Sequence, residues 1–407
     1  MYDKGNRALL WLGDPKLVVM SAPAPHLAQL RQAGYQGTRC VHPDSPSPSL
    51  CRDVAREPGL LRQVVQYAAP GRRLQLVPYA TTVEFFELVE RLRRDHGLEV
   101  LLPESPSPDG LWLRDYLDTK AGFRHLVGSW LEDGLLPEGF VCQDAAEAER
   151  ALTWLTRHGR PAIVKASRGN GGFGHTLFDG GGPEVRQRLE GNAFFRDDLL
   201  IVEERIVSPD QVFPAIEMFV PPSGSGQPRV THVCTELFLN GKVTGQIVTP
   251  ELALAPWRAS LDDIGRRLAA KLQAMGYVGI FDVDAVVDSD GRLYLLEMNT
   301  RRSAGTHAHE FACFAFGPDY ASRFTVICHN TLSSGRVSSV AELVEALDGL
   351  LYRAGCDTGI VITHSACLRS AEFGCIIVAP SSNQATSLQT DMLRRIDGFR
   401  PSSLGRS

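Results

Sequence analysis

The fold is decided by the stretch Ile163-Val164-Lys165-Ala166-Ser167-Arg168-Gly169-Asn170-Gly171-Gly172-Phe173-Gly174-His175. It starts as a short apolar strand that carries a lysine, and it continues into a loop with four glycines. This order suits the phosphates of a nucleotide, because a flexible glycine loop can close over them with backbone N–H donors. The alternative is a glycine-rich surface turn beside a solvated lysine.

Two familiar nucleotide motifs do not fit this stretch. Its glycines match the spacing GxGxxG of a dinucleotide-binding fold, but that motif runs directly into a helix, whereas residues 175–178 have a β-like pattern. A protein kinase would place its lysine after the glycine loop and would carry HRD and DFG motifs, which the sequence lacks. The stretch therefore points to another class of nucleotide site.

A second group of polar residues lies on two strands that flank the turn at 288–291. Strand alternation brings Asp282 and Asp284 onto one face, and it does the same for Glu297 and Asn299. Mg²⁺ prefers such oxygen ligands and usually takes one or two carboxylates, with phosphate and water completing the set. Solvated acids on an exposed hairpin are the alternative, but the apolar neighbours on both strands argue against it.

Two arginines lie directly after the second of these strands. An arginine such as Arg301 can bind a carboxylate or phosphoryl oxygen through two parallel hydrogen bonds, which predicts a substrate clamp beside the metal. One of the pair Arg301 and Arg302 could instead neutralise nearby acids. His307 and His309 lack a third obvious ligand, which disfavours a zinc site.

Composition excludes several classes of protein. The 407 residues are 43% hydrophobic and 22% charged, as in a globular protein of several subdomains, and the net charge of -5 gives no basic field for nucleic acid. No apolar run approaches the roughly 20 residues needed to cross a bilayer, and the N-terminus lacks a signal-peptide pattern. The nine cysteines form no CxxC pair, so we expect reduced thiols in a cytoplasmic protein.

The order of elements predicts a mixture of α/β and α+β structure. The first third alternates strand and helix patterns up to about Leu117, with an amphipathic helix at 82–95, and a helix is expected over 111–131. The middle region reads as antiparallel strands, including a hairpin of 229–239 and 242–249 around Asn240-Gly241. The tail is expected to hold a helix at 340–351, a strand at 374–379 and a helix at 384–396.

Taken together, several motifs resemble the ATP-grasp superfamily. They are Lys120, Lys165 with its glycine loop, the segment 201–206, and Asp284 with the segment 295–301. The resemblance covers about 119–310 and implies an ATP-grasp fold with an N-terminal pre-ATP-grasp α/β domain and a small C-terminal α/β segment. The implied domains are 1–118, 119–317 with a lid subdomain at about 119–200, and 318–407. The segment 299–307 and the C-terminal segment look most similar to the pheganomycin-type peptide ligases.

The resemblance implies roles for the nucleotide-binding residues. Lys120 and Lys165 would bind the α- and β-phosphates, and the mobile lid would be formed by the loop glycines Gly169, Gly171, Gly172 and Gly174. The residues implied for the adenine are Glu203, Glu204 and Ile206 at its edge, and Ile163 and Leu296 on the faces of its ring. Glu217 would meet the ribose hydroxyls.

The resemblance also implies the metal and catalytic residues. Asp284, Glu297 and Asn299 match the magnesium ligands, and Arg301 matches the residue that stabilises the transferring phosphoryl group. His307, or His309 beside it, is the candidate to accept the proton of an attacking amine.

The implied activity is that of an ATP-dependent carboxylate-amine ligase of biosynthesis. A carboxylate of an amino acid or similar acid would attack the γ-phosphate of ATP, and an amine or peptide acceptor would displace phosphate from the acylphosphate to form an amide or peptide bond. The products would be ADP and phosphate, with two Mg²⁺ ions as cofactors, Mn²⁺ as a substitute, and a homodimer as the assembly. Carboxylation, small-molecule phosphorylation and a non-catalytic nucleotide-binding module stay open as alternatives.

Overall fold

The computed structural model describes residues 5–400 apart from 69–70, 133, 170–173, 181–183, 240–241, 366–367 and 369. The chain divides into two compact units. The first unit consists of Met1–Pro103, Thr244–Ala253 and Ala304–Ser407, and the second consists of Glu104–Val243 and Leu254–Ser303. The domain boundaries predicted at 118 and 317 stay predictions.

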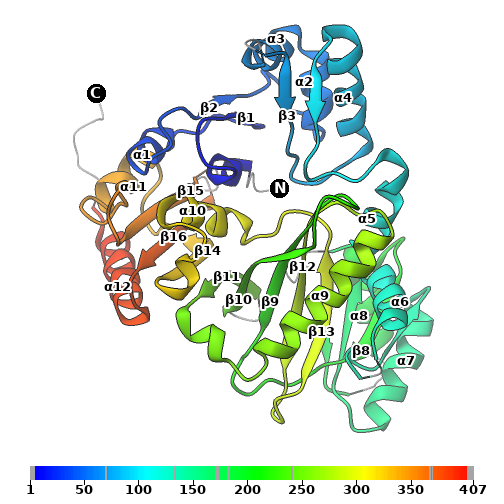
Figure 1. Cartoon of the computed structure of the whole chain (residues 1–407). Helices are drawn as coiled ribbons and strands as arrows, with labels where there is room; N and C mark the ends of the chain where they lie inside the picture. The colour runs from blue at the N-terminus through cyan, green and yellow to red at the C-terminus, as the bar shows by residue number, and fades with distance from the viewer. Residues whose placement is uncertain are drawn as a thin grey trace. The chain divides into compact units, whose positions relative to one another are not determined.

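Figure 1 labels the helices and strands. The α-helices are α1 Leu27–Gln32, α2 Leu50–Arg56, α3 Pro58–Tyr67, α4 Val83–His96, α5 Leu111–Leu117, α6 Lys120–Trp130, α7 Ala145–Arg157, α8 Glu184–Gly191, α9 Arg258–Ala274, α10 Thr306–Phe316, α11 Val340–Ala346 and α12 Ser382–Gly398. The strands are β1 Leu17–Val19, β2 Arg39–Val41, β3 Arg73–Gln75, β4 Glu99–Leu101, β5 Gly139–Cys142, β6 Ala162–Ala166, β7 His175–Phe178, β8 Leu200–Glu204, β9 Pro214–Val220, β10 Arg229–Leu239, β11 Lys242–Val248, β12 Gly279–Val287, β13 Leu293–Asn299, β14 Thr325–Ser333, β15 Gly359–His364 and β16 Glu372–Ala379. Short 3₁₀-helices are η1 Gly5–Leu10, η2 Pro108–Gly110, η3 Ala193–Phe195, η4 Pro250–Leu254 and η5 Tyr320–Ser322.

The first unit begins with alternating strands and helices, as predicted. β1 pairs with β2 and β3 pairs with β4, both in parallel. The predicted helix at 82–95 is α4: Thr82 caps it by accepting a hydrogen bond from Phe85 N, and Gly97 ends it with a φ of 58°. Its apolar face packs into a core with α2, α3 and the two parallel strands of that region. Later in the chain, β11, β14, β16 and β15 form antiparallel neighbours in that order.

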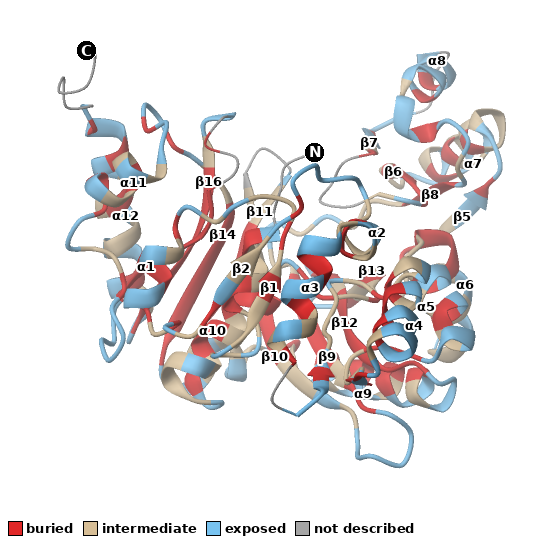
Figure 2. Ribbon diagram, turned by 90° about the horizontal axis from the view of Figure 1, so that it is seen from above, coloured by how far each residue is buried: buried red, intermediate tan, exposed pale blue. Residues whose placement is uncertain are grey.

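The second unit holds two sheets. One has the strand order β5-β8-β6-β7, and its apolar face is covered by α7 and α8. The other has the neighbours β13-β12-β9-β10. β9 and β12 are buried along most of their length (Figure 2), and α9 packs on β9. Gly265 allows this close approach, since a Cβ there would lie 2.8 Å from Ile216 Cδ1.

The helix expected over 111–131 is wrong in one respect, because the structure divides it into α5 and α6. The break lies at Asp118 and Thr119, where Thr119 Oγ1 accepts a hydrogen bond from Gly122 N at 3.0 Å and so starts a new helix. A Cβ at Gly122 would lie 2.0 Å from Tyr116 O, so this glycine permits the tight turn between the two helices. The break places Lys120 at the first position of α6 and so sets the direction of its side chain.

One predicted helix ends earlier in the structure than expected, and two strands were not predicted. The helix expected at 340–351 ends at Ala346. β14 and β15 were not predicted, and β14 buries polar residues such as His329 and Asn330, which obscure an alternating pattern. The expected turn at Asn240-Gly241 lies outside the described residues. Within the described part of the chain, no helix combines the length and apolarity that a membrane crossing requires, and the eight cysteines described there are free thiols.

Candidate active site

The predicted phosphate lysine on β6 belongs to a buried group of charges. Alternation places Ala162, Val164 and Ala166 in the apolar core, and it places Lys165 on the opposite face of the sheet beside β8. There Lys165 Nζ contacts Glu203 Oε1, while the other oxygen of Glu203 accepts a hydrogen bond from Arg124 Nη1 at 2.9 Å. The Glu203 side chain is only 3% exposed, so one buried carboxylate is held between two cations.

The other predicted phosphate lysine begins α6. Lys120 Nζ lies 2.6 Å from Glu297 Oε2 on β13, and it donates a hydrogen bond to Gly169 O at 2.9 Å. Burial opposes the charge of Glu297, but the adjacent ammonium of Lys120 outweighs it and lowers the pKa of that carboxyl to about 2. The structure therefore brings together a predicted phosphate lysine, a predicted metal carboxylate and the start of the glycine loop.

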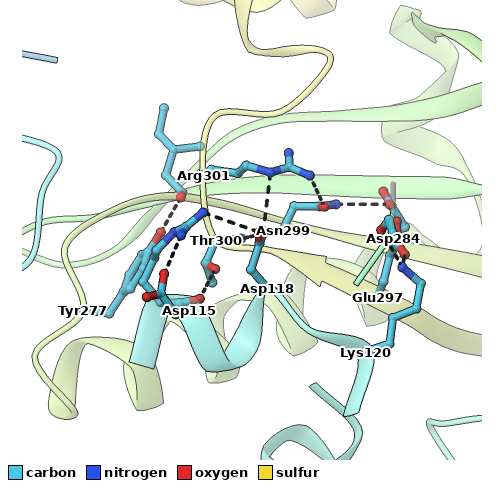
Figure 3. A network of polar contacts seen from close by, with 12 residues as sticks. Asp115, Asp118, Lys120, Tyr277, Asp284, Glu297, Asn299, Thr300 and Arg301 are labelled. Atoms are coloured by element: carbon cyan, nitrogen blue, oxygen red, sulfur yellow. Dashed lines mark hydrogen bonds and ion pairs between the residues drawn. The ribbon is translucent and has the colours of Figure 1, made fainter. Parts of the chain in front are cut away.

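The three predicted metal ligands also lie together. Asp284 on β12 is the register partner of Glu297 on β13, and Asn299 Nδ2 donates to Asp284 Oδ2 at 3.4 Å (Figure 3). Burial raises the pKa of Asp284 well above its usual value, and the neighbouring carboxylates of Glu236, Asp282 and Glu297 raise it further. Two of these neighbours have raised pKa values themselves, since burial and nearby acids raise the pKa of Glu236 to about 8 and that of Asp282 to about 7.

These carboxylates fit a divalent cation chemically. Adjacent buried acids repel one another, and a cation between Asp284 and Glu297 would relieve that repulsion. Among the described residues, no group of three or more His, Cys, Asp and Glu side chains is arranged to hold a metal ion. A Mg²⁺ ion that also binds phosphate does not need such a group, because it commonly takes only one or two protein carboxylates.

The predicted phosphoryl clamp lies at the end of β13. Arg301 Nη2 donates to Asn299 Oδ1 at 2.8 Å, and Arg301 Nε lies 3.6 Å from Asp118 Oδ1 (Figure 3). The guanidinium is thus tied to one predicted metal ligand and to the break between α5 and α6.

The next arginine has a different role. Arg302 is 1% exposed and forms two hydrogen bonds with Glu104, Nε to Oε2 at 2.9 Å and Nη2 to Oε1 at 2.7 Å. One residue further, Ser303 Oγ donates to Glu217 Oε2 at 2.8 Å. Of the two readings of the arginine pair, neutralisation of an acid is confirmed for Arg302, and both contacts fix the backbone that follows Arg301.

The residues predicted to meet the nucleoside have mixed surroundings. Ile163, Ile206 and Leu296 are half-buried on or beside their strands, and Arg160 Nη1 lies 3.4 Å from Glu204 Oε2. Glu217 is 1% exposed and also accepts a hydrogen bond from Thr231 Oγ1 at 2.8 Å, so it serves as an internal anchor of the sheet. The adenine and ribose contacts stay predictions.

The remaining predicted residues are His307 and the glycines of the loop. His307 belongs to the first unit, where it is 1% exposed and its Nε2 lies 3.5 Å from Cys328 Sγ. Its role as a proton acceptor stays a prediction. Gly171 and Gly172 lie outside the described residues, whereas Gly174 is described and has a φ of 81°, which favours glycine.

Sequence reasoning missed four residues of the site. Arg124 could have been found, because it lies four residues after Lys120 and so shares its helix face. Glu236 lies on the long strand β10 without a motif, and Glu104 and Asp118 lie in connecting segments. For these three residues, only the fold shows which charges they meet.

Comparison with curated proteins finds partial relatives, and no family model matches the chain. The propionyl-CoA carboxylase alpha chain of Ruegeria pomeroyi is 30% identical over 159 residues, which are 38% of this chain and 22% of that protein. The chloroplastic biotin carboxylase of Arabidopsis thaliana is 28% identical over 218 residues, which are 51% of this chain and 37% of that protein. The chain thus spans less than half of the length of these relatives.

Solved structures match over almost the whole chain. Biotin carboxylase of Campylobacter jejuni, in a β,γ-ATP complex, has a TM-score of 0.63 at 14% identity and covers 96% of this chain and 88% of its own. The biotin carboxylase domain dimer of a 2-oxoglutarate carboxylase from Hydrogenobacter thermophilus, with MgADP, ADP and bicarbonate, has a TM-score of 0.61 at 14% identity, covering 97% and 88%. N5-carboxyaminoimidazole ribonucleotide synthetase from Thermus thermophilus has a TM-score of 0.57 at 13% identity and covers 98% of both chains. These are ATP-grasp proteins, and this chain has the ATP-grasp fold.

Proposed function

We propose that this protein uses ATP and Mg²⁺ to activate a carboxylate as an acylphosphate and joins the acyl group to an amine, releasing ADP and phosphate. The observation that carries the proposal is the double contact of Lys120, which touches Glu297 at 2.6 Å and Gly169 O at 2.9 Å. It unites a cation for phosphate, a carboxylate for magnesium and a glycine loop in one compact unit. Solved structures of the same fold contain a β,γ-ATP compound or MgADP, which supports these ligands.

The two lysines would exchange partners when the nucleotide binds. In the structure they neutralise Glu203 and Glu297, and a phosphate chain would offer each of them a new anion. Glu297 would then be free to turn to the metal together with Asp284 and Asn299. Mg²⁺, when bound, would supply positive charge to the phosphate oxygens. The internal ion pairs thus keep the site charge-balanced before the nucleotide arrives.

Arg301 would act at the far end of the phosphate chain. The lysines occupy the side of the glycine loop, and Arg301 is connected to the site through Asn299, a predicted metal ligand. A guanidinium there can offset the charge that develops on the terminal phosphoryl group. This arrangement favours attack on the γ-phosphate and therefore ADP as the product.

The acid and the amine define two candidate reactions. The first is ligation of an amino acid or similar acid to an amine or peptide, as the resemblance to pheganomycin-type ligases implies. The second is carboxylation, in which bicarbonate is the activated acid. It is favoured by the partial relatives, which include a biotin carboxylase, and by the bicarbonate in one matched structure. Both reactions proceed through a mixed anhydride with phosphate and place the acyl group on nitrogen.

Product analysis distinguishes these candidates. The purified protein is incubated with ATP, Mg²⁺ and a panel of amines that includes amino acids and dipeptides, with or without ¹⁴C-bicarbonate. We expect acid-dependent ADP and phosphate, and hydroxylamine should trap an acyl hydroxamate when an amino acid is the substrate. Fixed ¹⁴C would select carboxylation. AMP with pyrophosphate would contradict the proposal, and so would phosphate retained on a small molecule or nucleotide binding without turnover. The cytoplasmic location and the homodimer stay predictions.

A further inference from the structure

Asp118 connects two segments of the site that are far apart in the sequence. It lies in the break between α5 and α6, two residues before Lys120. Its Oδ1 accepts a hydrogen bond from Thr300 N at 3.3 Å and lies 3.6 Å from Arg301 Nε (Figure 3). Its Oδ2 lies 3.4 Å from Arg114 Nη2. One carboxylate therefore meets the backbone and the side chain of consecutive residues at the end of β13.

A second hydrogen bond connects Thr300 to α5. Thr300 is 2% exposed, and its Oγ1 donates to Arg114 O at 2.7 Å. Thr300 therefore makes two hydrogen bonds to this region. Its backbone N–H donates to the Asp118 carboxylate, and its hydroxyl donates to a backbone carbonyl of α5. On the other side of Arg301, the bidentate pair of Arg302 and Glu104 holds the chain again. The backbone of Arg301 is thus fixed before and after it.

The charge of Asp118 acts on the guanidinium itself. Its carboxylate faces Nε of Arg301, and Asn299 accepts a hydrogen bond from Nη2, so the two contacts hold two nitrogens of one planar group. The side chains of Arg301 and Asp118 are 13% and 26% exposed, which reduces screening by water. A planar group held at two of its nitrogens has little rotational freedom left.

We propose that Asp118 is a positioning residue for phosphoryl transfer: it sets Arg301 relative to the helix start that carries Lys120. This inference rests on the proposed function. It predicts that Asp118 stabilises the transition state, in which charge develops on the transferring phosphoryl group. It also predicts that Asp118 contributes little to the affinity for the nucleotide alone.

The experiment compares two aspartates of the same short segment. Asp118→Asn keeps an oxygen for the hydrogen bond from Thr300 N and removes the charge that faces Arg301. Asp115→Asn is the matched control, because Asp115 also pairs with Arg114, at 2.5 Å, and its side chain is 56% exposed. Calorimetry of the whole protein measures the affinity for MgADP alone and for MgADP with aluminium fluoride, which mimics the phosphoryl group in transfer.

We expect the wild type and Asp115→Asn to bind MgADP more tightly when aluminium fluoride is present. In Asp118→Asn, the affinity for MgADP alone should stay within about 3-fold, and the fluoride complex should weaken by roughly 10- to 100-fold. In an Arg301→Ala background, Asp118→Asn should add little, because the two residues act as one unit. If Asp118→Asn does not fold, Asp118→Glu, which keeps the charge but displaces it, should show the same selective weakening.

Three results would overturn the inference. The first is that Asp118→Asn binds MgADP with aluminium fluoride as tightly as the control does. The second is that its affinity for MgADP alone falls as much as its affinity for the fluoride complex. The third is that Asp118→Asn weakens the fluoride complex as much in the Arg301→Ala background as in the wild type. The absence of any gain from fluoride in the wild type would also overturn it. A wild type that fails to bind MgADP at all would instead refute the proposed function.

Discussion

The site has two ends that are built differently. At one end, Lys165, Glu203 and Arg124 form a buried ion group on regular strands and a helix. At the other end, Arg301 lies after its strand has ended, and Asp118 and Asn299 hold its guanidinium. At the first end each charge needs its partner in order to stay buried, whereas at the second end the contacts orient the guanidinium of Arg301. Changes at the first end should therefore affect stability most, and changes at the second end should affect phosphoryl transfer.

The largest expected effect concerns the carboxylate between the two ends. Glu297→Gln removes a predicted metal ligand and the anion beside Lys120, so acid-dependent ADP formation should fall by on the order of 10³-fold. The free energy of unfolding should also fall, because the buried ammonium of Lys120 loses its partner. Asp290→Asn, an exposed change on the same hairpin, is the control for both assays. ADP formation at the wild-type rate would contradict the assignment of Glu297.

The next largest effect tests the first end. Glu203→Gln leaves Lys165 and Arg124 buried without their shared anion, and the unfolding free energy should fall by about 3–5 kcal/mol. Urea denaturation measures this change. Glu204→Gln on the same strand is the matched control, because Glu204 is 28% exposed and meets Arg160 only at 3.4 Å, so its loss should cost less than about 1 kcal/mol. Equal losses for the two variants would remove the distinction between the two ends.

The two ends also differed in how far the sequence revealed them. Lys165 and Glu203 lie on strands whose alternation and apolar neighbours are visible in the sequence, and both residues were predicted to belong to the site. Their contact with each other was not predicted. The predicted Mg²⁺ ligands Asp284, Glu297 and Asn299 lie together in the structure, as strand alternation indicated. The ATP-grasp fold agrees with the expectation from the motifs.

What the sequence did not reveal depends on breaks and on long-range contacts. The expected single helix over 111–131 hid Asp118, because nothing local required a break before the cap at Thr119. Glu104 is 198 residues from Arg302, and no period in the sequence connects them. Such contacts follow from the tertiary arrangement, so local patterns cannot supply them.

A smaller effect concerns pH and the acids near the metal ligands. Burial, together with Glu297 and Asp282, raises the pKa of Glu236 to about 8, so the folded state favours the protonated form. Its contribution to stability is present below the pKa of the unfolded chain, about 4.5, and is lost as the pH rises to about 8. Without metal or nucleotide, the unfolding free energy of Glu236→Gln should therefore fall less than that of the wild type between pH 5 and 8, by on the order of a few kcal/mol. Parallel pH curves in urea denaturation would count against this account.

The smallest effect concerns the start of α6. Thr119→Ala removes the side chain that accepts a hydrogen bond from Gly122 N at 3.0 Å, and it should cost about 1 kcal/mol of unfolding free energy. Thr119→Ser keeps the hydroxyl and should restore most of that loss. The comparison of the two variants in thermal or urea denaturation measures how far the break is fixed locally. If Ala and Ser are equally stable, the cap does not determine the break.

The central claim is that the site activates a carboxylate at the γ-phosphate of ATP. The most direct measurement is ³¹P NMR of the complete reaction with ATP, Mg²⁺, and either bicarbonate or an amino acid with a dipeptide. The account predicts ADP and inorganic phosphate that appear together and only when the acid is present. AMP and pyrophosphate, or ADP formation that does not depend on any acid in the panel, would contradict it.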